Sequence, residues 1–140
     1  MDAEVITQSL EIAAERRGDL TSIIYARLFT RFPQMEPLFI RDSDGSVRGE
    51  MLARTFEAIL DFIGARAYAG HLIQCEVVTH EGYGVPPEVF GRFFEAVADT
   101  LRAVIGADWT PAMESAWRRL LVELDWFATH PDQNAAVHGA

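Results

Sequence analysis

The 140-residue chain contains no lysine and a single cysteine, Cys75, and both scarcities narrow what the protein can be. One thiol excludes an internal disulfide and a zinc or iron–sulfur site built from several thiolates. The 12 basic residues are all arginines and stand against 21 acidic residues, which gives a formal net charge of −9. Because this balance repels phosphate backbones and anionic headgroups, nucleic acids and membrane surfaces are poor candidate partners.

Long apolar runs are missing as well. A helix needs about 18 consecutive apolar residues to span a bilayer, and the sequence contains no such stretch. The start, Met-Asp-Ala-Glu-Val, lacks the basic and apolar regions of a signal peptide, so the expected location is the cytoplasm. A composition of 49% hydrophobic and 24% charged residues is typical of a globular protein of one domain. We expect this domain at residues 1–129 and a loose tail at 130–140, which has no apolar face.

Strand-like alternation is nowhere sustained, whereas apolar residues recur at helical spacing along almost the whole chain. Ser46 is the expected N-cap of the helix after the turn at 41–46, and Thr110-Pro111 is a strong start signal for the last helix. The predicted fold class is therefore all-α. The expected helices are 4–17, 19–32, 47–63, about ten residues ending near His80, a long helix from Pro86 to Gly106, and one from Thr110 onward.

Several common functional motifs are absent, because no GxSxG, P-loop, GxGxxG or HExxH occurs. A zinc site is disfavoured: His71 and Cys75 could share a helix face, but His80 lies about half a turn out of phase with His71. The turn with Asp42 and Asp44 lacks the acidic first and twelfth positions of a calcium loop. A metal at His80 would thus need its other ligands from a cofactor.

Three polar residues stand out from their apolar surroundings. His80 ends an apolar helix directly before glycines and prolines, and it is either a capping or core histidine or a metal ligand. Arg48 shares a helix face with Leu52 and Phe56, so it either snorkels at the rim of the core or guards a pocket and pairs with an anionic cofactor group. Tyr25 is either half-buried core or a phenol that hydrogen-bonds a bound ligand.

Two segments carry a pattern of a known family. The first runs from His80 through Val85 and the pair Pro87-Glu88 to Phe90, and the second is Ala116-Trp117 in the last helix. In these segments the chain resembles the globin family, in particular its bacterial flavohaemoglobin-type and single-domain members. The resemblance covers about residues 5–128. It implies a globin fold, a helical sandwich around a haem pocket.

The resemblance also implies the cofactor, haem b, and the roles of individual residues. His80 matches the proximal ligand of the haem iron, and Tyr25 matches the distal tyrosine that stabilises a bound gas. Phe39 matches the phenylalanine that wedges against the haem, and Leu52 the apolar residue that lies over the iron. The haem pocket that it implies consists of Tyr25, Phe39, Arg48, Leu52, His80, Val85 and Phe90.

Three residues depart from the family pattern. Arg48 aligns with a distal Gln or His and is long enough to reach a haem propionate instead. Glu76 stands where an apolar haem contact is usual, and Phe90 replaces a proximal tyrosine of flavohaemoglobins. The sequence offers no obvious acidic partner for His80, and Tyr25 or Met51 could take the sixth coordination site of ferric iron.

The function implied by the resemblance is reversible dioxygen binding or transport at a five-coordinate iron, with nitric oxide and carbon monoxide as further ligands. Oxidation of nitric oxide would depend on an external reductase, since the chain ends at residue 140 without a flavin-binding segment. Whether the protein is an enzyme therefore stays open. The alternatives are a haem-based gas sensor or interaction module and a globin-fold protein without haem. A monomer and a homodimer are both compatible with the sequence.

Overall fold

The computed structural model describes residues 2–130, and these residues form six α-helices and two short 3₁₀ helices without a strand. This confirms the all-α fold class. The helices are α1 (Asp2–Arg17), α2 (Thr21–Arg31), η1 (Pro33–Phe39), α3 (Ser46–Ile63), α4 (Ala69–Gly82), α5 (Pro87–Ile105), η2 (Gly106–Asp108) and α6 (Pro111–Thr129). The tail expected at 130–140 lies outside the described residues except for His130.

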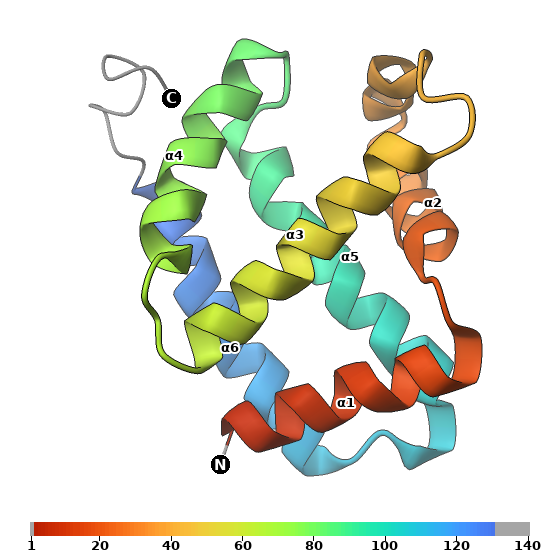
Figure 1. Cartoon of the computed structure of the whole chain (residues 1–140), viewed down its shortest axis with the longest axis vertical. Helices are drawn as coiled ribbons and strands as arrows, with labels where there is room; N and C mark the ends of the chain where they lie inside the picture. Colours follow the sequence, from red (N-terminus) through yellow and green to blue (C-terminus); the bar gives the residue numbers. More distant parts are fainter. Residues whose placement is uncertain (1, 131–140) are drawn as a thin grey trace.

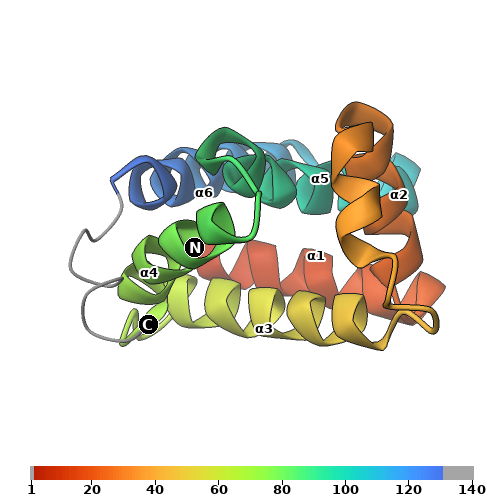
Figure 2. The same ribbon diagram turned by 90° about the horizontal axis from the view of Figure 1, so that it is seen from above.

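The helices pack in two layers. Figure 2 shows α5 and α6 in one layer, α1 and α3 in the other, and α2 and α4 at opposite ends. In Figure 1, α3 and α5 cross at the centre of the molecule, and α5 contacts α1, α2, α4 and α6. The helix α5 is therefore the central element of the core. None of the helices within residues 2–130 combines the length and the apolar character that crossing a membrane requires.

The start of α3 differs from the expected one. Ser46 is the first helical residue rather than the cap, and Gly45 takes the cap position with a left-handed φ of 76°. The side chain of Asp44 accepts the backbone N–H of Ser46 at 3.0 Å, and that of Asp42 accepts the N–H of Val47 at 3.0 Å. Carboxylates from the preceding turn thus satisfy the free N–H groups that a serine cap would have served. The cap expected at the start of α6 is confirmed, since the hydroxyl of Thr110 accepts the N–H of Met113 at 3.0 Å.

A fully buried tryptophan joins the first helix to the last. The indole Nε1–H of Trp117 in α6 donates to the hydroxyl of Ser9 in α1 at 2.9 Å. That hydroxyl donates in turn to the carbonyl of Ile6 at 2.6 Å. Because a buried indole N–H without a partner would be unfavourable, this bond fixes how α1 lies on α6.

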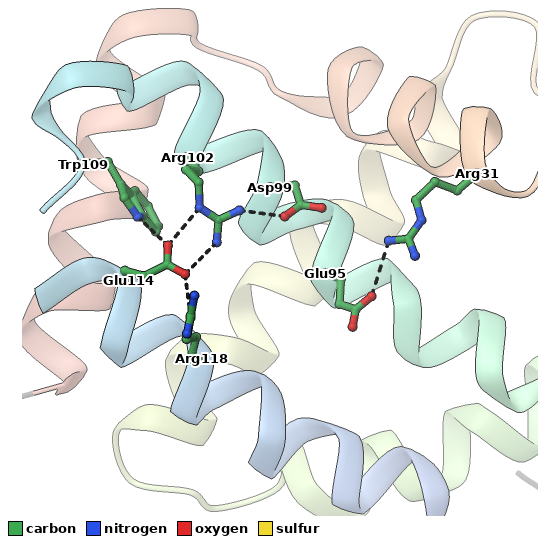
Figure 3. A network of polar contacts seen from close by, with 7 residues as sticks. All are labelled: Arg31, Glu95, Asp99, Arg102, Trp109, Glu114 and Arg118. Atoms are coloured by element: carbon green, nitrogen blue, oxygen red, sulfur yellow. Dashed lines mark hydrogen bonds and ion pairs between the residues drawn. The ribbon is translucent and has the colours of Figure 1, made fainter. Parts of the chain in front are cut away.

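A second polar contact ties the end of α5 to the start of α6, as Figure 3 shows. The carboxylate of Glu114 accepts the indole N–H of Trp109 at 2.9 Å, the Nε–H of Arg118 at 2.7 Å and the Nε–H of Arg102 at 2.9 Å. Arg102 also donates to Asp99 at 2.8 Å. The hydrogen bonds from Trp109, Arg118 and Arg102 lower the pKa of Glu114 to about 2.

The helix α4 lies unusually close to α6 at Gly70. A Cβ atom at this position would come within 2.8 Å of the ring of Phe127, which is shorter than any normal carbon–carbon contact. The ring of Phe127 cannot easily move, because it packs edge-on against Phe62 with ring centroids 5.4 Å apart. A glycine at position 70 is therefore required for this helix packing.

We expect Gly70→Ala to destabilise the protein by roughly 1–3 kcal/mol, because the strain of overpacking outweighs the better helix propensity of alanine. The free energy of unfolding from urea titration measures this effect. The matched control is Gly91→Ala in α5, where the added Cβ would meet Asp125 at an ordinary 3.5 Å and Ala128 at 3.8 Å. If Gly70→Ala is as stable as Gly91→Ala, the close packing does not constrain α4.

Candidate functional site

A cavity of about 600 Å³ lies between α2, η1, α3, α4 and α5. Its walls are mostly apolar and aromatic, which is typical of a binding site for a small molecule or cofactor. Five of the seven residues predicted from sequence line it: Tyr25, Phe39, His80, Val85 and Phe90. Helices that are far apart in the sequence, together with the loop between α4 and α5 that carries Val85, thus bring these five residues to one cavity.

A carboxylate in the last turn of α3 positions the helix that carries His80. The side chain of Asp61 accepts the backbone N–H groups of Ala67, Tyr68 and Ala69 at 3.1, 3.0 and 2.9 Å. These bonds, that from Tyr68 foremost, lower the pKa of Asp61 despite the opposing effect of burial. The start of α4 is thereby fixed, and the helix continues for three turns to place His80 at the cavity.

The side chain of His80 presents one nitrogen for ligation. Its Nδ1 lies 2.8 Å from the carbonyl oxygen of Glu76, one turn earlier in α4. Because a carbonyl only accepts hydrogen bonds, Nδ1 is the donor, and in the neutral imidazole Nε2 then keeps a free lone pair. The ring of Phe90 lies 5.0 Å from the imidazole, between ring centroids, and supports it from α5.

The carboxylate of Glu76 also lies near this nitrogen, with Oε2 3.5 Å from Nδ1 of His80. The sequence offered no obvious acidic partner for His80, and this expectation is wrong. A glutamate one helical turn before a histidine is the signal that was available, since residues four apart on a helix are neighbours. Glu76 lines the cavity as well.

Tyr25 faces the cavity from α2 and is 2% exposed. Its ring packs against Phe29, Phe39 and Phe93, with centroid distances of 5.9, 5.4 and 5.2 Å. Within residues 2–130 the hydroxyl has no hydrogen-bond partner, although a buried phenol normally finds one. Burial raises the pKa of Tyr25 well above its ordinary value of 10, so the phenol stays protonated and able to donate.

Arg48 and Leu52 are not among the residues that line this cavity, so the haem-pocket role expected for them stays a prediction. The Nε–H of Arg48 donates to the carboxylate of Asp42 at 2.9 Å, and Nη2 donates to its backbone carbonyl at 2.9 Å. Burial raises the pKa of Asp42, but the hydrogen bonds from Val47 and Arg48 outweigh this and lower it. Leu52 is only 3% exposed because it packs into the main core.

A different stripe of α3 faces the cavity: Met51, Thr55 and Ala58. These positions are spaced i, i+4 and i+7, as one face of a helix requires. The resemblance to globins instead pointed to Leu52, which lies on the neighbouring stripe with Phe56. The stripe with Leu52 packs into the core, whereas the less apolar stripe with Met51 and Thr55 lines the cavity.

Charged side chains are also among the residues that line the cavity. The lining includes Glu50, Arg54, Glu57 and Glu76. Within residues 2–130, Arg54 is the one arginine that lines the cavity. Arg54 pairs with Glu50 at 3.3 Å, and its side chain is 75% exposed, so it is free to exchange this partner for another anion. No group of three or more His, Cys, Asp or Glu side chains in the described part of the chain could hold a metal ion. A metal on His80 would take its remaining ligands from a cofactor.

The described residues thus form an all-α fold in which helices enclose a mostly apolar cavity with a histidine and an unpartnered tyrosine on its walls. The Globin family model matches residues 22–125, which is most of the chain. The protein belongs to the globin family. Globins generally bind haem and dioxygen, which accords with the residues that line this cavity. The comparison with curated proteins found no match.

The residues present fit a haem group. The apolar walls suit a large flat macrocycle, and the free Nε2 of His80 suits its iron. The hydroxyl of Tyr25 is buried without a partner inside the same cavity, which is a position that a polar ligand would satisfy.

Proposed function

We propose that the protein binds haem b in this cavity, with His80 as the proximal ligand and Tyr25 on the distal side, and that it binds dioxygen reversibly. The observation that carries the proposal is that His80, with Nδ1 bonded to a carbonyl, and Tyr25, with an unpartnered hydroxyl, line one cavity. When bound, haem supplies an iron with four porphyrin nitrogens and a free position for dioxygen, nitric oxide or carbon monoxide.

Four side chains of the cavity would each have a separate role toward the haem and its gas ligand. His80 donates the lone pair of Nε2 and keeps its orientation through the bond from Nδ1 to the Glu76 carbonyl. Tyr25 donates a hydrogen bond to the gas ligand, and Phe39 packs beside it and excludes water. Arg54 pairs with a haem propionate, which is the role that the sequence suggested for Arg48.

Oxidation of nitric oxide is the further reaction of this proposal. It consumes electrons that a separate reductase must supply, so its test combines the haem-loaded protein with such a reductase. Consumption of nitric oxide without any reductase beyond one turnover would contradict this requirement.

The proposal is tested by adding hemin to the purified protein and recording the Soret band. We expect saturation at one equivalent and an absorption spectrum of histidine-ligated iron. His80→Ala removes the axial nitrogen, so its spectrum should lose these features and regain them when imidazole is added to the solution. The measurement is the absorbance titration, repeated after reduction and addition of carbon monoxide.

His71→Ala is the matched control, because His71 belongs to the same helix but does not line the cavity. It should bind hemin with the spectrum of the unchanged protein. A protein that stays colourless in the presence of hemin, or identical spectra for His80→Ala and the unchanged protein, would exclude the proposed site.

A further inference from the structure

Two oxygen atoms of one residue converge on the same N–H group of His80. The backbone carbonyl of Glu76 lies 2.8 Å from Nδ1, and the side-chain Oε2 lies 3.5 Å from it. The imidazole is 25% exposed and the carboxylate side chain 42% exposed, so the pair lies at the edge of the cavity rather than deep in the core. The position is unusual for an acid, since the neighbouring cavity walls from α4 are the apolar Leu72 and Ile73.

The backbone carbonyl and the side-chain carboxylate of Glu76 have different effects on the imidazole of His80. The carbonyl already fixes the orientation and the tautomer of the imidazole, so the carboxylate is not needed for either. What the carboxylate adds is a negative charge beside the Nδ1–H bond, and this charge pulls the proton toward itself. An imidazole polarised in this way is a stronger donor through its other nitrogen, which is how outer carboxylates tune histidine ligands of metals.

We propose that Glu76 is a positioning residue of the proximal ligand, whose charge strengthens the bond from Nε2 of His80 to the iron and stabilises the ferric state. This rests on the proposed function, because it requires iron on His80. Two side chains are placed next to this imidazole: the uncharged ring of Phe90 and the carboxylate of Glu76. The charge that acts on Nδ1 is therefore that of Glu76. The effect is moderate because solvent screens a half-exposed carboxylate.

The test compares Glu76→Gln with the unchanged protein, both loaded with hemin. Glutamine keeps the shape of the side chain and removes its charge. We expect a lower iron–histidine stretching frequency in the resonance Raman spectrum of the ferrous protein. We also expect the equilibrium constant for reduction of the iron to rise about three- to tenfold, where a factor of ten is 59 mV for one electron.

Glu81→Gln is the matched control, because it removes an equal charge from the residue next to His80 on the same helix, at an exposed position. It should leave the stretching frequency unchanged. Glu76→Asp keeps the charge but shortens the side chain, and it should fall between Glu76→Gln and the unchanged protein. It also keeps the test decisive if the glutamine variant folds poorly.

The outcomes separate this inference from the proposed function. If hemin does not bind to the unchanged protein, the proposed function fails. If hemin binds and Glu76→Gln leaves both the stretching frequency and the reduction equilibrium unaltered, the inference alone is overturned. It is overturned as well if Glu81→Gln shifts both quantities as far, because the effect would then be that of charge in general.

Discussion

Replacing Tyr25 by phenylalanine is expected to speed the release of dioxygen from the haem-loaded protein by about ten- to hundredfold. A hydrogen bond from the phenol to a partly charged gas ligand is worth about 1.5–3 kcal/mol, and this amount is lost with the hydroxyl. The ring stays in place, because Phe29, Phe39 and Phe93 still pack around a phenylalanine at this position. Stopped-flow displacement of dioxygen by carbon monoxide measures the release rate.

The same substitution has a second expected result that distinguishes a binding role from a structural one. In the protein without haem, the hydroxyl of Tyr25 has no partner within residues 2–130, so removing it relieves an unsatisfied buried group. Tyr25→Phe should therefore leave the free energy of unfolding unchanged or raise it by about 1 kcal/mol. An unaltered release rate combined with lower stability would show that Tyr25 is a core residue only.

The other large effect is expected at Glu114, which joins Trp109, Arg102 and Arg118 (Figure 3). Glu114→Gln should lower the free energy of unfolding at pH 7 by roughly 2 kcal/mol, since a shift of one pKa unit is worth about 1.4 kcal/mol and solvent screens part of it. The side chain is 27% exposed, so screening is incomplete. Chemical denaturation at pH 7 measures the loss.

The pH dependence gives this prediction its sign. The folded protein lowers the pKa of Glu114 from 4.5 to about 2, so the stabilisation is fully present above pH 4.5 and is lost as the pH falls toward 2. The difference between Glu114→Gln and the unchanged protein should therefore shrink steadily between these values. Glu15→Gln, at an exposed position on α1, is the control and should show little difference at any pH. A difference that stays constant down to pH 2 would contradict the role of the charge.

The sequence predicted the helices for a physical reason, whereas the cavity residues were named mainly through the resemblance to globins. Helical periodicity of apolar residues is a local property, and so are the prolines and glycines that end the helices. His80 and Tyr25 could be found because each is a polar residue on an otherwise apolar helix face. Their presence in a common cavity follows from the globin fold and not from their spacing.

The orientation of α3 could not be predicted in the same way. Two apolar stripes run along this helix, and the packing of the whole molecule decides that Leu52 faces the core and Met51 the cavity. The partner of Arg48 was missed because Asp42 lies six residues earlier, across a turn whose conformation depends on the left-handed φ of Gly45. A contact of this kind has no periodic signature.

The hydrogen bonds between Arg48 and Asp42 connect two of the elements that surround the cavity. The backbone N–H of Asp42 donates to the carbonyl of Phe39 at 2.9 Å, while its side chain holds the first turn of α3 through Arg48. Asp42 therefore connects the end of η1, which carries Phe39, to the first turn of α3, which leads to Met51, and both of these residues line the cavity. Arg48 does not line the cavity, yet by holding Asp42 it ties together two of the elements that form its walls.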